Sequence, residues 1–184
     1  MPSPIGHALG GIAAGGVAAG ARLDRDAWAL AALGMLADCD LLFGAHSGPS
    51  HSIGAAALVG LATFVVARVR RHPAAVRMAV AALLAYVSHP LLDWLGTDSS
   101  PPIGIMALWP FTREHYESPF HVFMAVSRRY WQGDAFWIHN VAAVVREVII
   151  LGPATAGVWW VCGSRQRAAA RTATRRGRAE RSRG

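Results

Sequence analysis

The sequence predicts an all-α protein, a multipass transmembrane bundle of about four or five membrane helices with additional interfacial helices. The chain of 184 residues is 53% hydrophobic and only 16% charged, whereas soluble domains carry about 25% charged residues. Long apolar stretches recur along it, and tryptophans gather near their ends, as they do at membrane–water interfaces. A soluble protein built around a buried helical bundle is the alternative, and the low charge favours the membrane.

Five apolar stretches are candidate membrane helices. In chain order they cover residues 4–21, 27–38 (continuing into 41–44), 53–69, 78–96 and 148–163. A spanning helix needs about 20 apolar residues, within a range of about 17–25. The third and fourth stretches meet this length, the first and fifth are borderline, and the second is short. Glycines in the first stretch lie at the small-xxx-small spacing that lets membrane helices approach closely.

The region between the last two stretches, residues 97–147, has a different composition. It contains proline-rich turns and a mixture of aromatic and charged residues. We expect a loop with one or two interfacial helices there, over residues 118–130 and 136–146. The chain is thus interpreted as a membrane-embedded domain, residues 1–163, followed by a disordered arginine-rich tail, residues 164–184.

The net charge of +7 belongs to that tail. Residues 1–163 contain ten arginines and ten acidic residues, whereas the tail contains eight arginines and only Glu180. The tail is expected to contact anionic lipid headgroups. Specific nucleic-acid binding is not expected, because the tail has no aromatic residue to stack on bases. The arginines after the first stretch, those between the third and fourth, and the tail fall on one face of an alternating bundle, which the positive-inside rule assigns to the cytoplasm.

Seven histidines and aspartates beside the apolar stretches fall at the opposite end of the predicted bundle. They are His7, Asp38, Asp40, His46, His51, His89 and Asp93. Each has a structural explanation when taken alone, such as a helix cap or a single His–Asp pair. Together they point to one cause, because ionisable groups at membrane depth are costly and usually face a cavity or a partner. His89 and Asp93 share a helix face at spacing i, i+4, and imidazole with carboxylate suits zinc, iron or manganese.

These residues lie in motifs that resemble those of the YdjM-like family of bacterial inner-membrane, metal-dependent hydrolases. The matching segments are His7, Asp38-Cys39-Asp40, His46-Ser47-Gly48-Pro49-Ser50-His51-Ser52, Ser88-His89-Pro90-Leu91-Leu92-Asp93 and Leu108-Trp109-Pro110. The family pattern reads roughly PDxDH, HRGxTHS, SHxxxD and LWP, and it covers about residues 5–111. Ala37, Leu41 and Ser47 stand where the family has proline, often histidine, and arginine. The missing arginine argues against a phosphate-clamping role at Ser47.

The resemblance implies a helical hydrolase of the inner membrane with a divalent metal, which we expect to be zinc. The arginine placement puts this site on the non-cytoplasmic face. Carried over by position, its ligands are His7, Asp38, Asp40, His51, His89 and Asp93. His46 would be a ligand or the general base, and Asp40 is the alternative proton acceptor. The family is also distantly similar to zinc phospholipase C and zinc nucleases, which implies an ester or phosphoester substrate, such as a lipid or a lipid-linked molecule.

Two further expectations concern the substrate and the alternative to catalysis. Trp109 of the last motif, and Arg113 and His115 shortly after it, are candidate substrate contacts, because they lie on the same predicted face. The non-enzymatic alternative is a membrane protein whose metal site is structural or serves transport. An open coordination position would favour the enzyme, because structural sites are closed by four protein ligands.

Overall fold

The computed structural model describes residues 1–20, 23–43, 47–99 and 101–181, and within these ranges the chain is helical and forms no β-strand. The elements in order are α1 (Pro4–Ala19), α2 (Leu23–Met35), the 3-10 helix η2 (Leu36–Phe43), α3 (Ile53–Val69), α4 (Ala75–Trp94), the 3-10 helix η3 (Tyr130–Gln132) and α5 (Asp134–Arg181). The all-α class predicted from composition and apolar stretches is therefore correct.

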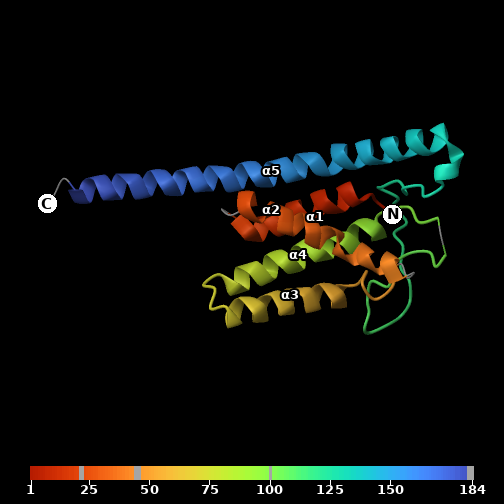
Figure 1. The fold of residues 1–184 in the computed structure, drawn as a ribbon, viewed down its shortest axis with the longest axis horizontal. Coiled ribbons are helices and arrows are strands. Elements are labelled where there is room, and N and C mark those ends of the chain that lie inside the picture. The colour runs from red at the N-terminus through yellow and green to blue at the C-terminus, as the bar shows by residue number, and fades with distance from the viewer. Residues whose placement is uncertain (21–22, 44–46, 100, 182–184) are drawn as a thin grey trace.

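Helix α1 lies at the centre of the bundle. It packs against α2, α4 and α5, while α3 lies at the edge and packs on α4. Figure 1 shows α5 along one side of the bundle and continuing well past it toward the C-terminus. The N-terminus, the end of α4 and the long connection between α4 and α5 gather at the other end of the bundle (Figure 1).

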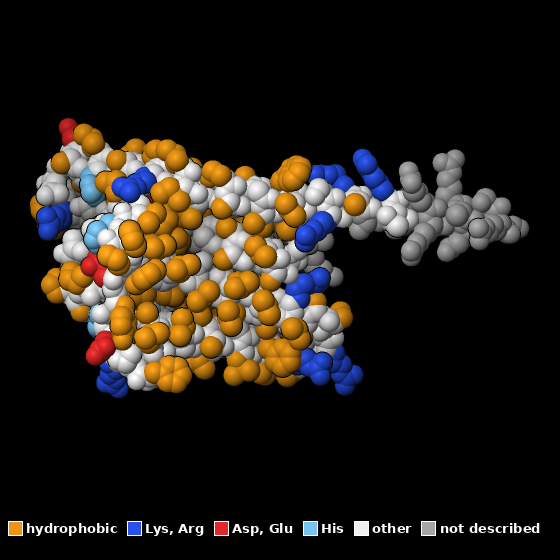
Figure 2. All heavy atoms as spheres, turned by 180° about the vertical axis from the view of Figure 1, so that it is seen from behind, with side chains coloured by type: hydrophobic (Ala, Val, Ile, Leu, Met, Phe, Trp, Pro, Cys, Tyr) orange, Lys and Arg blue, Asp and Glu red, His pale blue; other side chains and the backbone are white. Residues whose placement is uncertain are grey.

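Two of the described helices are long and apolar enough to cross a membrane, judged by length and composition. They are Ala75–Trp94, which is α4, and Asp134–Arg165 within α5. α1 and α3 are also apolar but have only 16 and 17 residues. The described helices of spanning length are therefore fewer than the four or five membrane helices that the sequence predicts. Figure 2 shows apolar side chains over the middle of the visible face, with charged groups toward its two ends. This surface is suited to a bilayer.

The predicted stretches match most of the helices closely. α3 covers the same residues as the third stretch, α1 ends two residues before the first stretch does, and α4 begins three residues before the fourth. α5 extends beyond the fifth stretch in both directions and reaches Arg181, where a disordered tail was expected. Alanine and arginine are among the strongest helix formers, which gives the tail its helical preference.

The interfacial helix predicted over residues 118–130 is wrong. Up to residue 129 this segment is not helical, and its backbone N–H groups at Ser118 and Val122 donate to the carbonyl oxygens of Trp94 and Leu95. The chain therefore satisfies these groups against the end of α4 rather than within a helix of its own. Residues 136–146 are helical as predicted, but they form the beginning of α5 and not a separate element.

Helices α1 and α2 cross in direct backbone contact. A Cβ added to Gly11 would lie 2.5 Å from the carbonyl oxygen of Leu30 and 2.9 Å from Cα of Gly34. A Cβ added to Gly34 would overlap the carbonyl oxygen of His7. Only glycine permits this approach at both positions, and the contact fixes the distance between His7 and the end of α2.

We expect Gly34→Ala to destabilise the fold by about 1–3 kcal/mol, because the new methyl group forces α2 away from α1. Unfolding of the detergent-purified protein, followed by circular dichroism, measures the change. Gly157→Ala is the matched control, since a Cβ there meets no described atom within 4 Å. It should leave stability unchanged or raise it by up to about 1 kcal/mol through helix propensity. Equal stability of the two variants would contradict the backbone contact.

Candidate metal centre

The candidate site lies at the end of the bundle that contains the N-terminus. α1 supplies His7, η2 supplies Asp38 and Asp40, and α4 supplies His89 and Asp93. His51 comes from the turn immediately before α3. His46, the predicted ligand or general base, lies outside the described residues. The structure therefore brings together six of the seven histidines and aspartates that the sequence singled out.

Local sequence features place these side chains. Ser3 caps α1, because its side chain accepts from the N–H of Gly6, and His7 follows at the end of the first turn. Ser52 caps α3 in the same way by accepting from the N–H of Ala55, which holds His51 at the entrance of the helix. Side-chain caps of this kind satisfy N–H groups that have no partner within the helix.

The carboxylate of Asp93 is the centre of the cluster. Its Oδ1 lies 3.3 Å from Nε2 of His7, and its Oδ2 lies 3.1 Å from Nε2 of His89 and 3.4 Å from Nε2 of His51. All four side chains are buried, with at most 1% of each side chain exposed. The rings of His7 and His89 stack with their centroids 3.7 Å apart.

Asp38 completes the cluster on its accessible side. Its Oδ1 lies 3.5 Å from Nε2 of His89 and 3.7 Å from Nε2 of His51. In contrast to the buried groups, 26% of its side chain is exposed. The cluster is thus enclosed by protein on the side of His7 and open to the surroundings beside Asp38.

These atoms fit a divalent cation. Nε2 of His89 and both carboxylate oxygens of Asp93 are buried and form no hydrogen bond with good geometry. Oδ2 of Asp93 nevertheless lies 3.1 Å from Nε2 of His89 and 3.4 Å from Nε2 of His51. Two sets of ligand atoms, one from His7, Asp38 and His89 and one from His51, His89 and Asp93, each lie within 4.8 Å of one another. Tetrahedral ligands at zinc-like bond lengths are separated by about 3.3 Å, which is close to the spacings found here.

A second layer of contacts orients two of the imidazoles. Nδ1 of His89 donates to the carbonyl oxygen of Gly34 at 2.7 Å, which leaves Nε2 facing the cluster. Nδ1 of His51 lies 3.2 Å from Oδ2 of Asp40, and Ser50 donates to the same oxygen at 2.7 Å. Asp40 is thus on the far side of the His51 ring from Asp38 and Asp93. Such outer contacts fix the tautomer and direction of metal-binding histidines.

The cluster attracts positive charge. Burial alone would raise the pKa of Asp38, but the neighbouring His51 and His89 imidazoles outweigh it and hold that pKa well below its ordinary value. Burial alone would lower the pKa of His51, but the carboxylates of Asp38 and Asp40 outweigh it and raise that pKa. Protons or a divalent cation can supply the positive charge that these carboxylates require.

Glu147 is a buried charged residue at this end that the sequence analysis did not select. It lies on α5 with no exposed surface, and it accepts hydrogen bonds from the backbone N–H of Ser3, at 2.7 Å, and from the Ser3 hydroxyl. Gly6 leaves room for its carboxylate. The only signal in the sequence is an acidic residue directly before a long apolar stretch. Glu147 joins α5 to the beginning of α1, the helix that carries His7.

The candidate substrate contacts lie around the same end but outside the cluster. The carbonyl oxygen and ring of Trp109 lie close to Gly54 at the beginning of α3. Arg113 is exposed and His115 is half-buried. The described residues show no contact of Arg113 or His115 with the histidines and aspartates of the cluster.

Comparison with known proteins places the chain in a family. A family model described as YdjM inner membrane protein matches residues 1–167. Comparisons with curated proteins and with solved structures find no match. The matched range includes every described residue of the cluster and both helices of spanning length. The chain therefore belongs to the YdjM inner membrane protein family.

Proposed function

We propose that this protein is a membrane-bound, metal-dependent hydrolase that cleaves an ester or phosphoester in a lipid or lipid-linked substrate. The observation that carries the proposal is the convergence of three imidazoles and two carboxylates with one open side, at Asp38. A purely structural site would be closed on all sides by protein ligands. The partial exposure of Asp38 instead leaves room for water and a substrate oxygen.

The ligands of the proposed ion come from one of two sets, either His7, Asp38 and His89 or His51, His89 and Asp93. Either set supplies three protein ligands, which leaves a fourth position for water as in catalytic zinc sites. When bound at such a site, a zinc-like ion lowers the pKa of a bound water to about 7 and polarises the substrate oxygen. Asp93 holds three imidazoles in place, and Asp40 with Ser50 fixes the direction of His51. We assign removal of the water proton to His46 or to Asp40, whose side chain is 13% exposed.

A lipid-type substrate is supported by the apolar rim of the site. Leu41 and Leu42 directly follow Asp40, and Ile53 follows shortly after His51; their exposed fractions are 41%, 82% and 46%. An acyl chain can lie against these side chains while the polar bond that is cleaved faces the cluster. Trp109, next to Gly54, extends the same rim. Arg113 and His115 are proposed to contact the polar part of the substrate.

We expect His89→Ala and Asp93→Ala each to reduce bound metal from near-stoichiometric to background, since each removes a ligand from the centre of the cluster. Elemental analysis of the detergent-purified protein measures the content. His121→Ala is the matched control, because this histidine lies at the same end but 48% of its side chain is exposed. Asp93→Asn, which keeps the side-chain volume, should behave like Asp93→Ala. Full metal retention in all three cluster variants would refute the site.

We expect Asp40→Asn to weaken metal affinity by about 10- to 100-fold, as loss of an outer contact to a ligating histidine usually does. Asp38→Asn, which removes a ligand oxygen, should weaken it further. Chelator competition on the two variants gives both affinities. The reverse order of the two effects would place Asp40, rather than Asp38, against the ion.

We expect hydrolysis of a phosphoester or phospholipid probe to disappear after chelation and to return when zinc, iron or manganese is added. A panel of phosphodiester, phosphomonoester and carboxylic ester probes tests the activity in detergent micelles. The Co²⁺-loaded protein should change its visible spectrum when a small phosphate or hydroxamate ligand is added, because an open coordination position accepts it. A spectrum indifferent to such ligands, together with no activity on the panel, would support a structural site instead.

A further inference from the structure

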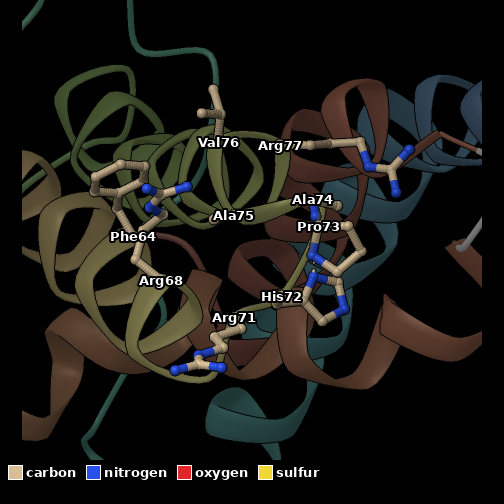
Figure 3. Close-up of a pocket in the computed structure, with 9 residues that line it drawn as sticks. All are labelled: Phe64, Arg68, Arg71, His72, Pro73, Ala74, Ala75, Val76 and Arg77. Carbon is tan, nitrogen blue, oxygen red and sulfur yellow. Dashed lines mark hydrogen bonds between the residues drawn. The ribbon is translucent and has the colours of Figure 1, made fainter.

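A basic pocket lies at the end of the bundle opposite the metal centre. It has a volume of about 870 Å³ and is formed by the end of α3, the turn that follows and the beginning of α4. Its cationic side chains are Arg68, Arg71 and Arg77, and the His72 ring lies between them (Figure 3). This pocket plays no part in the proposed hydrolysis.

The arginines of the pocket lie in a segment of the sequence without acidic residues. The sequence contains no acidic residue between Asp40 and Asp93. In the part of the chain that the structure describes, Arg68, Arg71 and Arg77 form no ion pair. Arg25 and Asp26, in the first turn of α2, also form no ion pair in the described part of the chain; Arg25 is exposed and Asp26 is half-buried. Three guanidinium groups around one cavity without a counterion attract an anion from outside the chain.

The backbone of the turn places one of these arginines at a position that glycine ordinarily takes. Arg71 has a φ of 52°, in the left-handed region. The N–H of His72 donates to the carbonyl of Ala67 at 2.8 Å, which closes the end of α3. A helix that ends in this way usually has glycine at the left-handed residue. The sequence therefore keeps a guanidinium in the pocket at a conformational cost that glycine would avoid.

The His72 ring is fixed as a hydrogen-bond donor to the pocket. Its Nδ1 accepts from the N–H of Ala74 at 3.2 Å, so the proton of the neutral ring lies on Nε2. Three guanidinium groups and an imidazole N–H are donors suited to phosphate oxygens, and arginine binds phosphate through two parallel hydrogen bonds.

Apolar side chains flank the pocket on the bundle surface. Val69 is 78% exposed and Val76 is 66% exposed, and Val65 and Val66, each 50% exposed, continue this surface along α3. Figure 2 shows basic side chains at both ends of the apolar band, including the end away from the histidines. A free inorganic anion cannot bury these apolar side chains, whereas the acyl chains of a lipid can.

We propose that this pocket binds the phosphodiester headgroup of an anionic phospholipid, with the acyl chains lying along α3 and α4. The phosphate faces Arg68, Arg71 and Arg77, and the valines contact the chains. An arginine near a membrane surface contributes about fivefold to the affinity for anionic lipid. Binding should therefore depend on these particular arginines and not on the overall charge of the protein.

Native mass spectrometry of the full-length protein in detergent, titrated with phosphatidylglycerol, phosphatidylcholine or inorganic phosphate, tests the proposal. We expect phosphatidylglycerol to bind more tightly than phosphatidylcholine and to resist competition by millimolar inorganic phosphate. The double variant Arg68→Gln/Arg71→Gln should bind phosphatidylglycerol about 30-fold more weakly. Arg128→Gln/Arg129→Gln removes the same charge at the other end of the bundle and should bind as the unmodified protein does.

A single substitution separates binding from folding. Arg71→Gly relieves the left-handed backbone, so it should unfold at the same or a higher temperature while losing about fivefold in affinity for phosphatidylglycerol. Equal loss of lipid in the two double variants would overturn the proposal, as would equal binding of phosphatidylglycerol and phosphatidylcholine. Displacement of the lipid by inorganic phosphate at similar concentrations would also overturn it, because the site would then be one for a soluble anion.

Discussion

The burial of the Asp93 carboxylate is the constraint on which this end of the bundle depends. An ionised carboxylate removed from water costs several kcal/mol unless opposite charge and hydrogen-bond donors surround it. The three imidazoles that lie within 3.4 Å of Asp93 come from α1, from the turn before α3 and from α4 itself. These elements must therefore meet at one point for the carboxylate to be tolerated. The contacts that stabilise the Asp93 carboxylate are therefore also the contacts that bring these elements together at the end of the bundle.

The glycine contact between α1 and α2 serves the same requirement. Gly11 and Gly34 allow the two backbones to touch, and this brings the Gly34 carbonyl to the Nδ1 proton of His89. A larger residue at either position would widen the crossing and remove that acceptor. The glycines of α1 are typical of membrane helices, and they also have a second consequence here. They set the direction of an imidazole on a different helix.

Much of the fold and of the site composition is predictable from the sequence, because both depend on local patterns. The length of each apolar stretch predicts a helix, and the alternating direction of successive helices places the ionisable residues at one end of the bundle. The i, i+4 spacing puts His89 and Asp93 on one helix face. The direction of Asp40 is not predictable in this way. Asp38 and Asp40 are two residues apart, and only the 3-10 path of η2 turns Asp38 inward and places Asp40 behind the His51 ring. Glu147 was missed because its partner, Ser3, is 144 residues away, so no local pattern reveals that this carboxylate is buried.

The location of the cluster at the end of the bundle, rather than at its middle, suits the hydrolysis that we propose. At membrane depth, non-helical backbone is tolerated only where protein or a water-filled cavity surrounds it. The turn before α3 is such backbone, and both this turn and the 3-10 helix η2 lie where the α-helices end. Water can reach Asp38 there, while Asp93 stays fully buried. A cluster at the middle of the apolar band would meet the same burial cost without a supply of water. The His/Asp cluster thus lies at the end of the bundle, where water can reach it, and the apolar band covers the middle. This separation allows one short chain to remain in a membrane and still bring water to a buried carboxylate.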